Sequence, residues 1–76
     1  MTIAEDIVDV AISGDRVAVA TLAGGVWVLD AGTGRTLAVL RGHTSRVSSV
    51  EFGAGGGWLV SGSWDATARV WDIREL

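Results

Sequence analysis

The chain has 76 residues, 49% of them hydrophobic, and a formal net charge of −3 at pH 7. A domain near this size buries only about 60% of its unfolded surface and relies on disulfides, a metal or oligomerisation, and a chain with no Cys and one His leaves only oligomerisation. The six basic residues are all Arg and are outnumbered by nine acidic residues, so no basic stripe exists to neutralise phosphates, which excludes nucleic acid as a partner.

Seven short apolar runs separated by turn residues predict an all-β chain. In chain order the expected strands are Ile7 to Ile12, Arg16 to Thr21, Val26 to Asp30, Arg35 to Leu40, Val47 to Phe52, Trp58 to Gly62 and Thr67 to Asp72. Eleven glycines and no proline suit tight turns between antiparallel strands. Several strands are apolar on both faces, which indicates sheets that are covered on both sides.

The two halves of the chain repeat. The matched positions are Val10 and Ile12 with Val50 and Phe52, 40 residues apart, and Val17, Val28 and Asp30 with Leu59, Val70 and Asp72, 42 residues apart. We therefore predict a single unit of two blades, with residues 1–40 forming the first and residues 41–76 the second. Only four residues follow Asp72, so the second blade is expected to lack an outer strand and to have an open edge.

Residues 41–72 begin with a Gly42-His43 pair and end with Trp71-Asp72, and three strand-like runs lie between them. This segment resembles one WD40 repeat, which implies a four-stranded propeller blade. The resemblance also implies a structural hydrogen-bonded set of His43, Ser61, Asp65 and Trp71, with Ser63 as the alternative hydroxyl. Such a set leaves no buried polar group without a partner.

The first half departs from this pattern at the corresponding positions. Val19, Ala23 and Leu29 stand where the second half has Ser61, Asp65 and Trp71, and the Gly-His position falls on Thr2-Ile3. We expect apolar packing by Val19, Val28 and Leu29 to replace the hydrogen-bonded set. The first blade should then be less sharply specified than the second.

The residue inventory argues against catalysis, metal binding and cofactor binding. Ser63 and His43 could suggest a hydrolase triad, but the Ser lies in no nucleophile elbow and no oxyanion site is evident. One His with scattered carboxylates does not supply the three or four ligands of a metal site. The Gly32 to Arg35 and Gly53 to Gly57 segments have no P-loop Lys and no following helix, so we interpret both as hairpin turns.

Partner-binding candidates come from the WD40 resemblance, because such propellers usually present the loop before the first strand and the turn between the second and third. In this chain that surface carries Arg46, Ser48 and Trp64. Trp and Arg are common anchors of binding hot spots, although Trp64 has packing on the neighbouring blade as an equal alternative. Trp27 and Trp58 are expected at blade interfaces, and Asp30 and Asp72 are expected to cap turns.

Two blades cannot close a propeller, which needs about 4 to 8. We therefore predict a non-catalytic, protein-interaction scaffold that forms a closed ring with copies of itself, as a tetramer of eight blades or, alternatively, a trimer of six. The other interpretation is an isolated or truncated propeller fragment with only a structural role. No run approaches the ~20 apolar residues of a membrane helix, and the acidic N-terminus does not match a secretion signal, so we expect a cytoplasmic chain away from membranes.

Overall fold

The structure is a computed structural model that describes residue 3 and residues 5–76. Seven strands form two antiparallel sheets in this part of the chain, which confirms the all-β prediction. The strands are β1 (Ile7–Ser13), β2 (Arg16–Thr21), β3 (Val26–Asp30), β4 (Thr36–Leu40), β5 (Val47–Phe52), β6 (Trp58–Ser63) and β7 (Ala68–Asp72). No helix of the described residues is long and apolar enough to span a bilayer.

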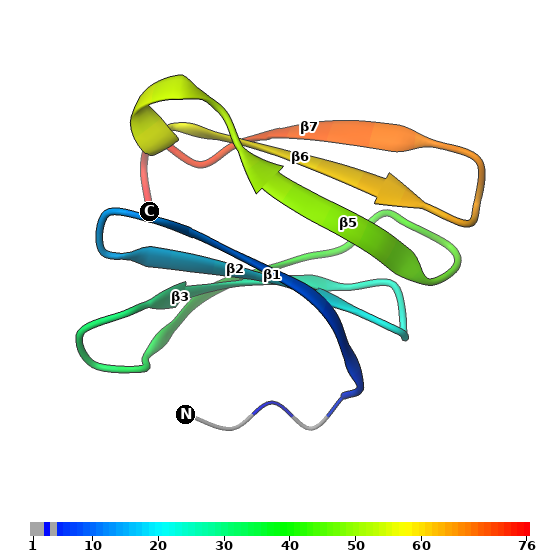
Figure 1. The fold of residues 1–76 in the computed structure, drawn as a ribbon, viewed down its shortest axis with the longest axis horizontal. Helices are drawn as coiled ribbons and strands as arrows, with labels where there is room; N and C mark the ends of the chain where they lie inside the picture. Colours follow the sequence, from blue (N-terminus) through cyan, green and yellow to red (C-terminus); the bar gives the residue numbers. More distant parts are fainter. Residues whose placement is uncertain (1–2, 4) are drawn as a thin grey trace.

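The strands follow one another as meanders. The first sheet has the order β1-β2-β3-β4 and the second has the order β5-β6-β7. The two sheets lie one above the other as two layers, and the C-terminus lies near the β1–β2 turn (Figure 1). The outer edge of β7 has no strand partner among the described residues.

Strand bounds differ from the prediction by one residue at four places, each next to a turn. Ser13 and Ser63 join their strands, each still paired across the hairpin. Arg35 leaves the fourth strand, where its carbonyl accepts the Asp30 N–H at 2.8 Å and closes the turn. Thr67 leaves the seventh, because its N–H is taken by the Asp65 carboxylate at 2.8 Å.

The turn expected between Gly53 and Gly57 contains a short 3-10 turn, η1 (Ala54–Gly56). The Gly53 N–H donates to the Trp58 carbonyl at 2.9 Å, so the ends of the loop are held together at the base of the hairpin. The Asp30 carboxylate accepts the N–H groups of Gly32 and Thr33, as a turn-capping residue does.

The main core lies between the two sheets. The inner face of the first sheet meets the inner face of the second, and the buried residues of this cluster are Ala18, Ala20, Val26, Val28, Val47, Val50, Leu59 and Ile73. Small Ala residues on β2 allow a close approach of the sheets, and branched residues fill the remaining space. Val28 belongs to this cluster and not to the group with Val19 and Leu29, so the predicted grouping of these three residues is wrong.

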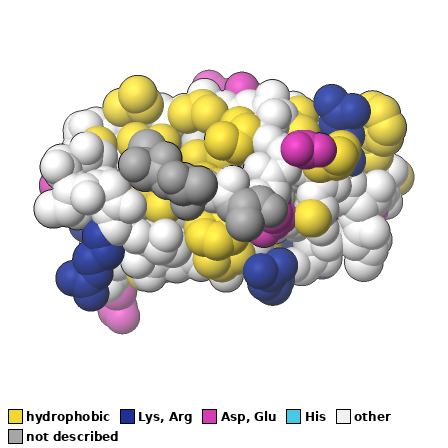
Figure 2. Space-filling view, turned by 90° about the horizontal axis from the view of Figure 1, so that it is seen from below, with side chains coloured by type: hydrophobic (Ala, Val, Ile, Leu, Met, Phe, Trp, Pro, Cys, Tyr) yellow, Lys and Arg dark blue, Asp and Glu magenta, His cyan; other side chains and the backbone are white. Residues whose placement is uncertain are grey.

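The outer face of the first sheet carries a second, smaller cluster. Val17, Val19 and Leu29 are buried there, with Ile3 and Trp27 packed against them. The indole N–H of Trp27 donates to the Glu5 carboxylate at 3.1 Å, which ties the N-terminal segment to this face. Figure 2 views the molecule from this side and shows hydrophobic side chains gathered along the middle of the face.

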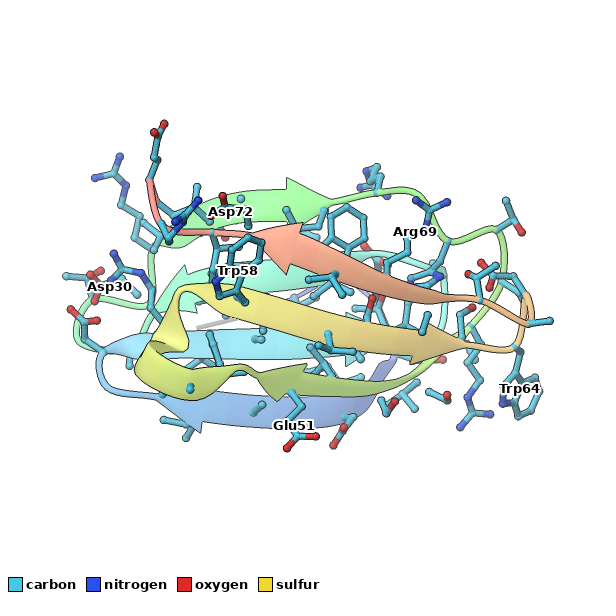
Figure 3. All side chains as sticks on the ribbon, turned by 90° about the horizontal axis from the view of Figure 1, so that it is seen from above. Asp30, Glu51, Trp58, Trp64, Arg69 and Asp72 are labelled. Atoms are coloured by element: carbon cyan, nitrogen blue, oxygen red, sulfur yellow. The ribbon has the colours of Figure 1, made fainter. Side chains whose placement is uncertain are left out.

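The outer face of the second sheet is open to solvent. Trp58, Val60 and Val70 project from it with 40%, 42% and 66% of their surface exposed. Trp58 and Trp27 therefore lie on the outer faces of this two-sheet unit and not between its sheets, and their place at an interface with a further blade stays a prediction. Figure 3 shows Trp58 on this side, with Glu51 at the neighbouring strand.

Candidate functional site

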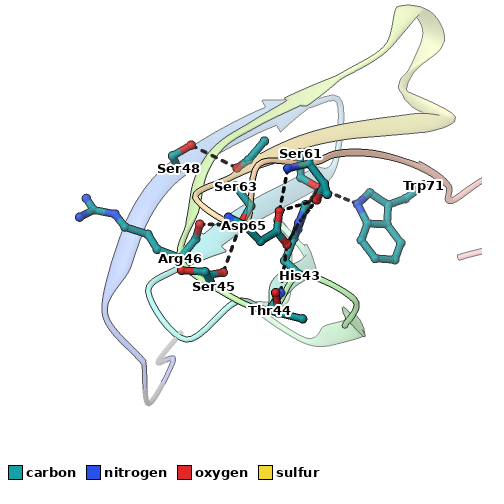
Figure 4. A network of polar contacts seen from close by, with 11 residues as sticks. His43, Thr44, Ser45, Arg46, Ser48, Ser61, Ser63, Asp65 and Trp71 are labelled. Carbon is teal, nitrogen blue, oxygen red and sulfur yellow. Dashed lines mark hydrogen bonds and ion pairs between the residues drawn. The ribbon is translucent and has the colours of Figure 1, made fainter.

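A network of polar side chains connects four separate segments of the second sheet. His43 lies in the loop between β4 and β5, Ser61 on β6, Asp65 in the β6–β7 turn and Trp71 on β7. Their hydrogen bonds meet in one place near the end of the blade (Figure 4). The structure thus brings together the four residues that the WD40 resemblance singles out.

The His43 ring is the centre of the network. Its Nδ1 lies 3.0 Å from Asp65 Oδ2, and its Nε2 lies 2.7 Å from Ser61 Oγ. The Trp71 indole N–H donates to the same Ser61 oxygen at 2.8 Å. A neutral imidazole with its proton on Nδ1 satisfies every group, because Nδ1 then donates to the carboxylate and Nε2 accepts the Ser61 hydroxyl proton.

Asp65 accepts more hydrogen bonds than sequence reasoning anticipates. The Thr44 N–H donates to Oδ2 at 3.0 Å, and both the N–H and the hydroxyl of Thr67 donate to Oδ1. The hydroxyl of Thr67, followed by the backbone N–H of Thr44 and the ring of His43, holds the pKa of Asp65 well below its usual range, and burial opposes this only in part. The residue therefore stays ionised at neutral pH.

Thr44 and Thr67 are members of this network that the sequence interpretation missed. The sequence Asp65-Ala66-Thr67 is typical of an Asx turn, in which a carboxylate accepts the N–H two residues later. That signal was sufficient to find Thr67. The contact of Thr44 depends on the path of the β4–β5 loop and has no local signal in the sequence.

Ser63, the alternative hydroxyl, has a different role. Its Oγ donates to the carbonyl of Arg46 at 2.8 Å and accepts the Asp65 N–H at 3.1 Å. It therefore fixes the β4–β5 loop against the β6–β7 turn, while Ser61 is the hydroxyl that contacts His43.

Ser61, His43 and Asp65 have the connectivity of a hydrolase triad, but their hydrogen bonds hold the blade together. We call the set of His43, Ser61, Asp65 and Trp71 the hydrogen-bonded lock. Ser61 has 0% exposed surface, and its oxygen is already engaged by Trp71 and His43. A nucleophile must reach a substrate carbonyl, and this hydroxyl has no path to one. The described residues contain no group of three His, Asp or Glu side chains placed to hold a metal.

The corresponding place in the first sheet is filled by apolar side chains. Val19 and Leu29 stand at the positions of Ser61 and Trp71, and Ile3 packs against their cluster as His43 does in the second sheet. Thr2, the other residue at the Gly-His position, lies outside the described residues. Whether this blade is less sharply specified stays a prediction.

The three partner-binding candidates lie at the end of the second sheet beside the lock. The Arg46 guanidinium stacks over the Trp64 ring, 4.5 Å from its centroid. Trp64 has 69% of its surface exposed, and Figure 3 shows it projecting beyond the end of the strands. Ser48 is exposed on β5, and its hydroxyl donates to the Gly62 carbonyl at 3.2 Å.

A WD40 family model, described as "WD domain, G-beta repeat", matches residues 34–72, just over half of the 76 residues. The chain belongs to the WD40 repeat family. The matched segment begins just before β4 and ends with β7, so it contains the complete hydrogen-bonded lock.

Relatives with the same repeat are much longer proteins. The Periodic tryptophan protein 2 homolog of Neurospora crassa is 52% identical over 48 residues, which are 63% of this chain and 5% of that protein. The U3 small nucleolar RNA-associated protein 21 homolog of Schizosaccharomyces pombe is 41% identical over 61 residues, 80% of this chain and 7% of that protein. This chain therefore spans only a small part of the length of these relatives.

Two solved structures have a similar fold. The computationally designed Ika4 protein superimposes with a TM-score of 0.86 and 31% identity, over 97% of this chain and 45% of that chain. The β-propeller domain of Myceliophteria thermophila Cps50 (Swd1) superimposes with a TM-score of 0.90 and 24% identity, over 97% of this chain and 24% of that chain. The two sheets are therefore two neighbouring blades of a β-propeller.

Proposed function

We propose that this chain is a non-catalytic scaffold whose copies close into one WD40 propeller and present a repeated protein-binding surface. The observation that carries the proposal is the apolar outer face of the second sheet, where Val60 and Val70 stand in solvent on a folded blade. Patches of this kind on a small domain mark a surface that is covered in the working state.

The number of copies follows from the two blades in each chain. Propellers close with about 4 to 8 blades, so four copies give eight blades and three copies give six, with the tetramer favoured. A head-to-tail contact between identical units must close into a ring, since an open one grows into fibres.

The binding surface proposed for each copy consists of Arg46, Ser48 and Trp64. The stacked Arg46 and Trp64 side chains combine a large exposed ring with a held charge, which suits a protein or peptide partner. A ring would repeat this pair around one rim, so a multivalent partner would bind through avidity.

A pull-down with Trp64→Ala tests the binding surface. Leu22→Ala is the matched control, because Leu22 occupies the same turn position in the first sheet and is also exposed. Loss of partner binding in Trp64→Ala, with binding kept in Leu22→Ala, supports the assignment. Equal binding by both variants would show that Trp64 is not an anchor.

The native mass of the purified chain tests the ring. A discrete mass of four or three chains supports it. The second candidate function, a structural piece of a longer propeller, is supported by the small part of the relatives that the chain spans and by the open edge of β7. A monomeric or aggregated chain at high concentration favours this second function over the ring.

The remaining expectations from the sequence belong to the same proposal. We infer a cytoplasmic scaffold without a cofactor that binds neither nucleic acid nor membranes. The excess of acidic over basic residues supports the absence of a nucleic-acid partner.

A further inference from the structure

The two sheets are copies of one backbone design, related by shifts of 40 and 42 residues. The Leu22 N–H donates to the Asp6 carbonyl at 2.9 Å, and the Trp64 N–H donates to the Arg46 carbonyl at the same distance. The β1–β2 and β5–β6 pairings also have their irregularity at the same place, after Ile7 and after Val47. Positions in one sheet can therefore be matched to positions in the other.

This matching relates the buried inner face of the first sheet to the open outer face of the second. Ala18 and Val28 have 0% exposed surface, whereas their counterparts Val60 and Val70 have 42% and 66%. The other two matched pairs are Ala20 with Gly62 and Val26 with Ala68. The second sheet thus leaves uncovered the positions that the first sheet buries against its neighbour.

The same relation holds in the opposite direction. The inner face of the second sheet buries Val47 and Val50 against the first sheet, with Phe52 partly buried. The matched residues of the first sheet are Ile7, Val10 and Ile12, with 54%, 49% and 70% of their surface exposed. Each end of the two-blade unit therefore exposes one half of the interface that already exists in its middle.

We propose that the outer face of the second sheet in one copy docks on the outer face of the first sheet in the next copy, in the register of the internal interface. This inference rests on the proposed self-assembly and specifies its partner surfaces. The contact is heterologous, because each internal face is complementary to the opposite face and not to itself. Val60 and Val70 then lie against Ile7, Val10 and Ile12 of the next copy.

The register also predicts a polar contact between neighbouring copies. In the internal interface the Asp9 carboxylate accepts the Val50 N–H at 3.0 Å across the two innermost strands. Ser49 stands at the position of Asp9, so in this register its hydroxyl faces the backbone N–H of Val10 of the next copy, which in the single chain donates to Asp9 Oδ1 at 3.0 Å. Ser49 is exposed in the single chain and free to take that orientation.

The β2–β3 turn and the β6–β7 turn differ at one matched position that bears on the register. The first has Gly24 there and the second has Ala66. A Cβ on Gly24 would stand 2.9 Å from the His43 carbonyl and 3.1 Å from the Ser45 carbonyl of the neighbouring loop. The matched residue is Ala66, which has a φ of 71° and carries a Cβ. In the proposed register this methyl group crowds the Ile3 and Glu5 carbonyls of the next copy.

Two charge variants test the faces by native mass spectrometry and sedimentation. Val70→Asp alters the outer face of the second sheet and Val10→Asp that of the first, while Leu22→Asp is a control at an exposed residue of the β2–β3 turn. Each face variant alone should be monomeric, and Leu22→Asp should assemble as the wild type does. A mixture of the two face variants retains one intact pair of faces and should form a one-to-one pair of chains.

The outcomes separate this register from the ring itself. A wild-type chain that assembles while Val10→Asp also assembles, or face variants that do not pair when mixed, would overturn the register but leave the ring. A monomeric wild-type chain overturns both. Circular dichroism confirms that each variant is folded before its mass is interpreted.

Ala66→Gly provides a test that does not depend on disrupting a face. Removing the crowding methyl should lower the chain concentration at half-assembly by roughly tenfold, because overpacking of a tight contact costs free energy only in the assembled state. An unchanged half-assembly concentration would show that Ala66 does not meet the next copy and would overturn the register.

Discussion

Ser61 is a hydroxyl without accessible surface that donates to His43 and accepts from Trp71. In a hydrolase the same connectivity raises the reactivity of an exposed oxygen. Here the hydrogen bonds to His43 and Trp71 hold two strands, a turn and a loop together, so the same residue types produce rigidity. Burial of the Ser, and not the identity of the three residues, separates the two uses.

The first prediction concerns this hydroxyl. Ser61→Ala leaves the His43 Nε2 and the Trp71 N–H without a partner, and a buried unsatisfied polar group costs about 1–3 kcal/mol. We expect the free energy of unfolding in urea to fall by at least that amount. Ser48→Ala, which removes an exposed hydroxyl on the same sheet, should change it by less than about 0.5 kcal/mol. Similar values for the two variants would show that the network contributes little to stability.

The second prediction concerns the stability of the chain at low pH. The pKa of Asp65 is depressed in the folded chain, so the unfolded chain binds more protons in acid and stability falls as the pH decreases below about 4, the ordinary pKa of Asp. Asp65→Asn has no such group and should lose less stability between pH 5 and pH 3, measured by urea unfolding at each pH. Some loss should remain, because the Arg74 side chain lowers the pKa of Asp72 to about 2. An identical acid dependence in both proteins would contradict the prediction.

At the scale of the secondary-structure elements, the β2–β3 and β6–β7 hairpins share a backbone hydrogen bond but differ in their side-chain contacts. The Thr21 N–H donates to the Gly25 carbonyl and the Ser63 N–H to the Thr67 carbonyl, both at 3.1 Å. In the β6–β7 hairpin the Asp65 carboxylate also contacts the His43 ring. In the β2–β3 hairpin the Thr21 hydroxyl donates to the Gly25 carbonyl and accepts the Gly25 N–H. Backbone turn geometry therefore persists where the polar lock is absent.

The third prediction tests how closely the two sheets approach at this turn. Gly24 has a φ of 99° and lies against two carbonyls of the next loop, so Gly24→Ala combines backbone strain with a clash. Gly14→Ala is the matched control, since Gly14 has a φ of 57° and nothing within 4 Å. We expect Gly24→Ala to lower the free energy of unfolding by about 1–3 kcal/mol more than the control does. Equal losses would mean that the β4–β5 loop moves aside readily.

The sequence predicts the strands well because turn residues and short apolar runs are local signals. It predicts the contact of His43 with Asp65 only through the WD40 resemblance, since the two residues are 22 positions apart and meet through the fold. The grouping of Val28 with Leu29 was wrong because adjacent residues of a strand point to opposite faces, and Val28 is on the face that meets the other sheet. The positions of Trp27 and Trp58 were expected in an interface that the single chain does not itself contain.

At the scale of the whole molecule, the stability of the chain and its assembly both depend on how much apolar surface is covered. A chain of 76 residues with a three-stranded sheet exposed on one side has a small core of its own. Covering Val60, Val70 and Trp58 removes apolar surface from water, at roughly 25 cal/mol for each Å² buried. Ile7, Val10 and Ile12 are likewise exposed on the first sheet, so assembly would cover apolar side chains on both outer faces.

The fourth prediction follows from mass action. If assembly covers the outer faces, the folded state is stabilised by association and the melting temperature must rise with chain concentration. For a domain of this size each kcal/mol gained raises it by about 4–8 °C, so a hundredfold increase in concentration should produce a shift of several degrees in calorimetry. Val70→Asp, in which one docking face carries a charge, should melt at a temperature independent of concentration and close to that of the dilute wild type. A concentration-independent wild-type melting temperature would mean that the chain folds without its copies, because an equilibrium that involves several chains cannot ignore their concentration.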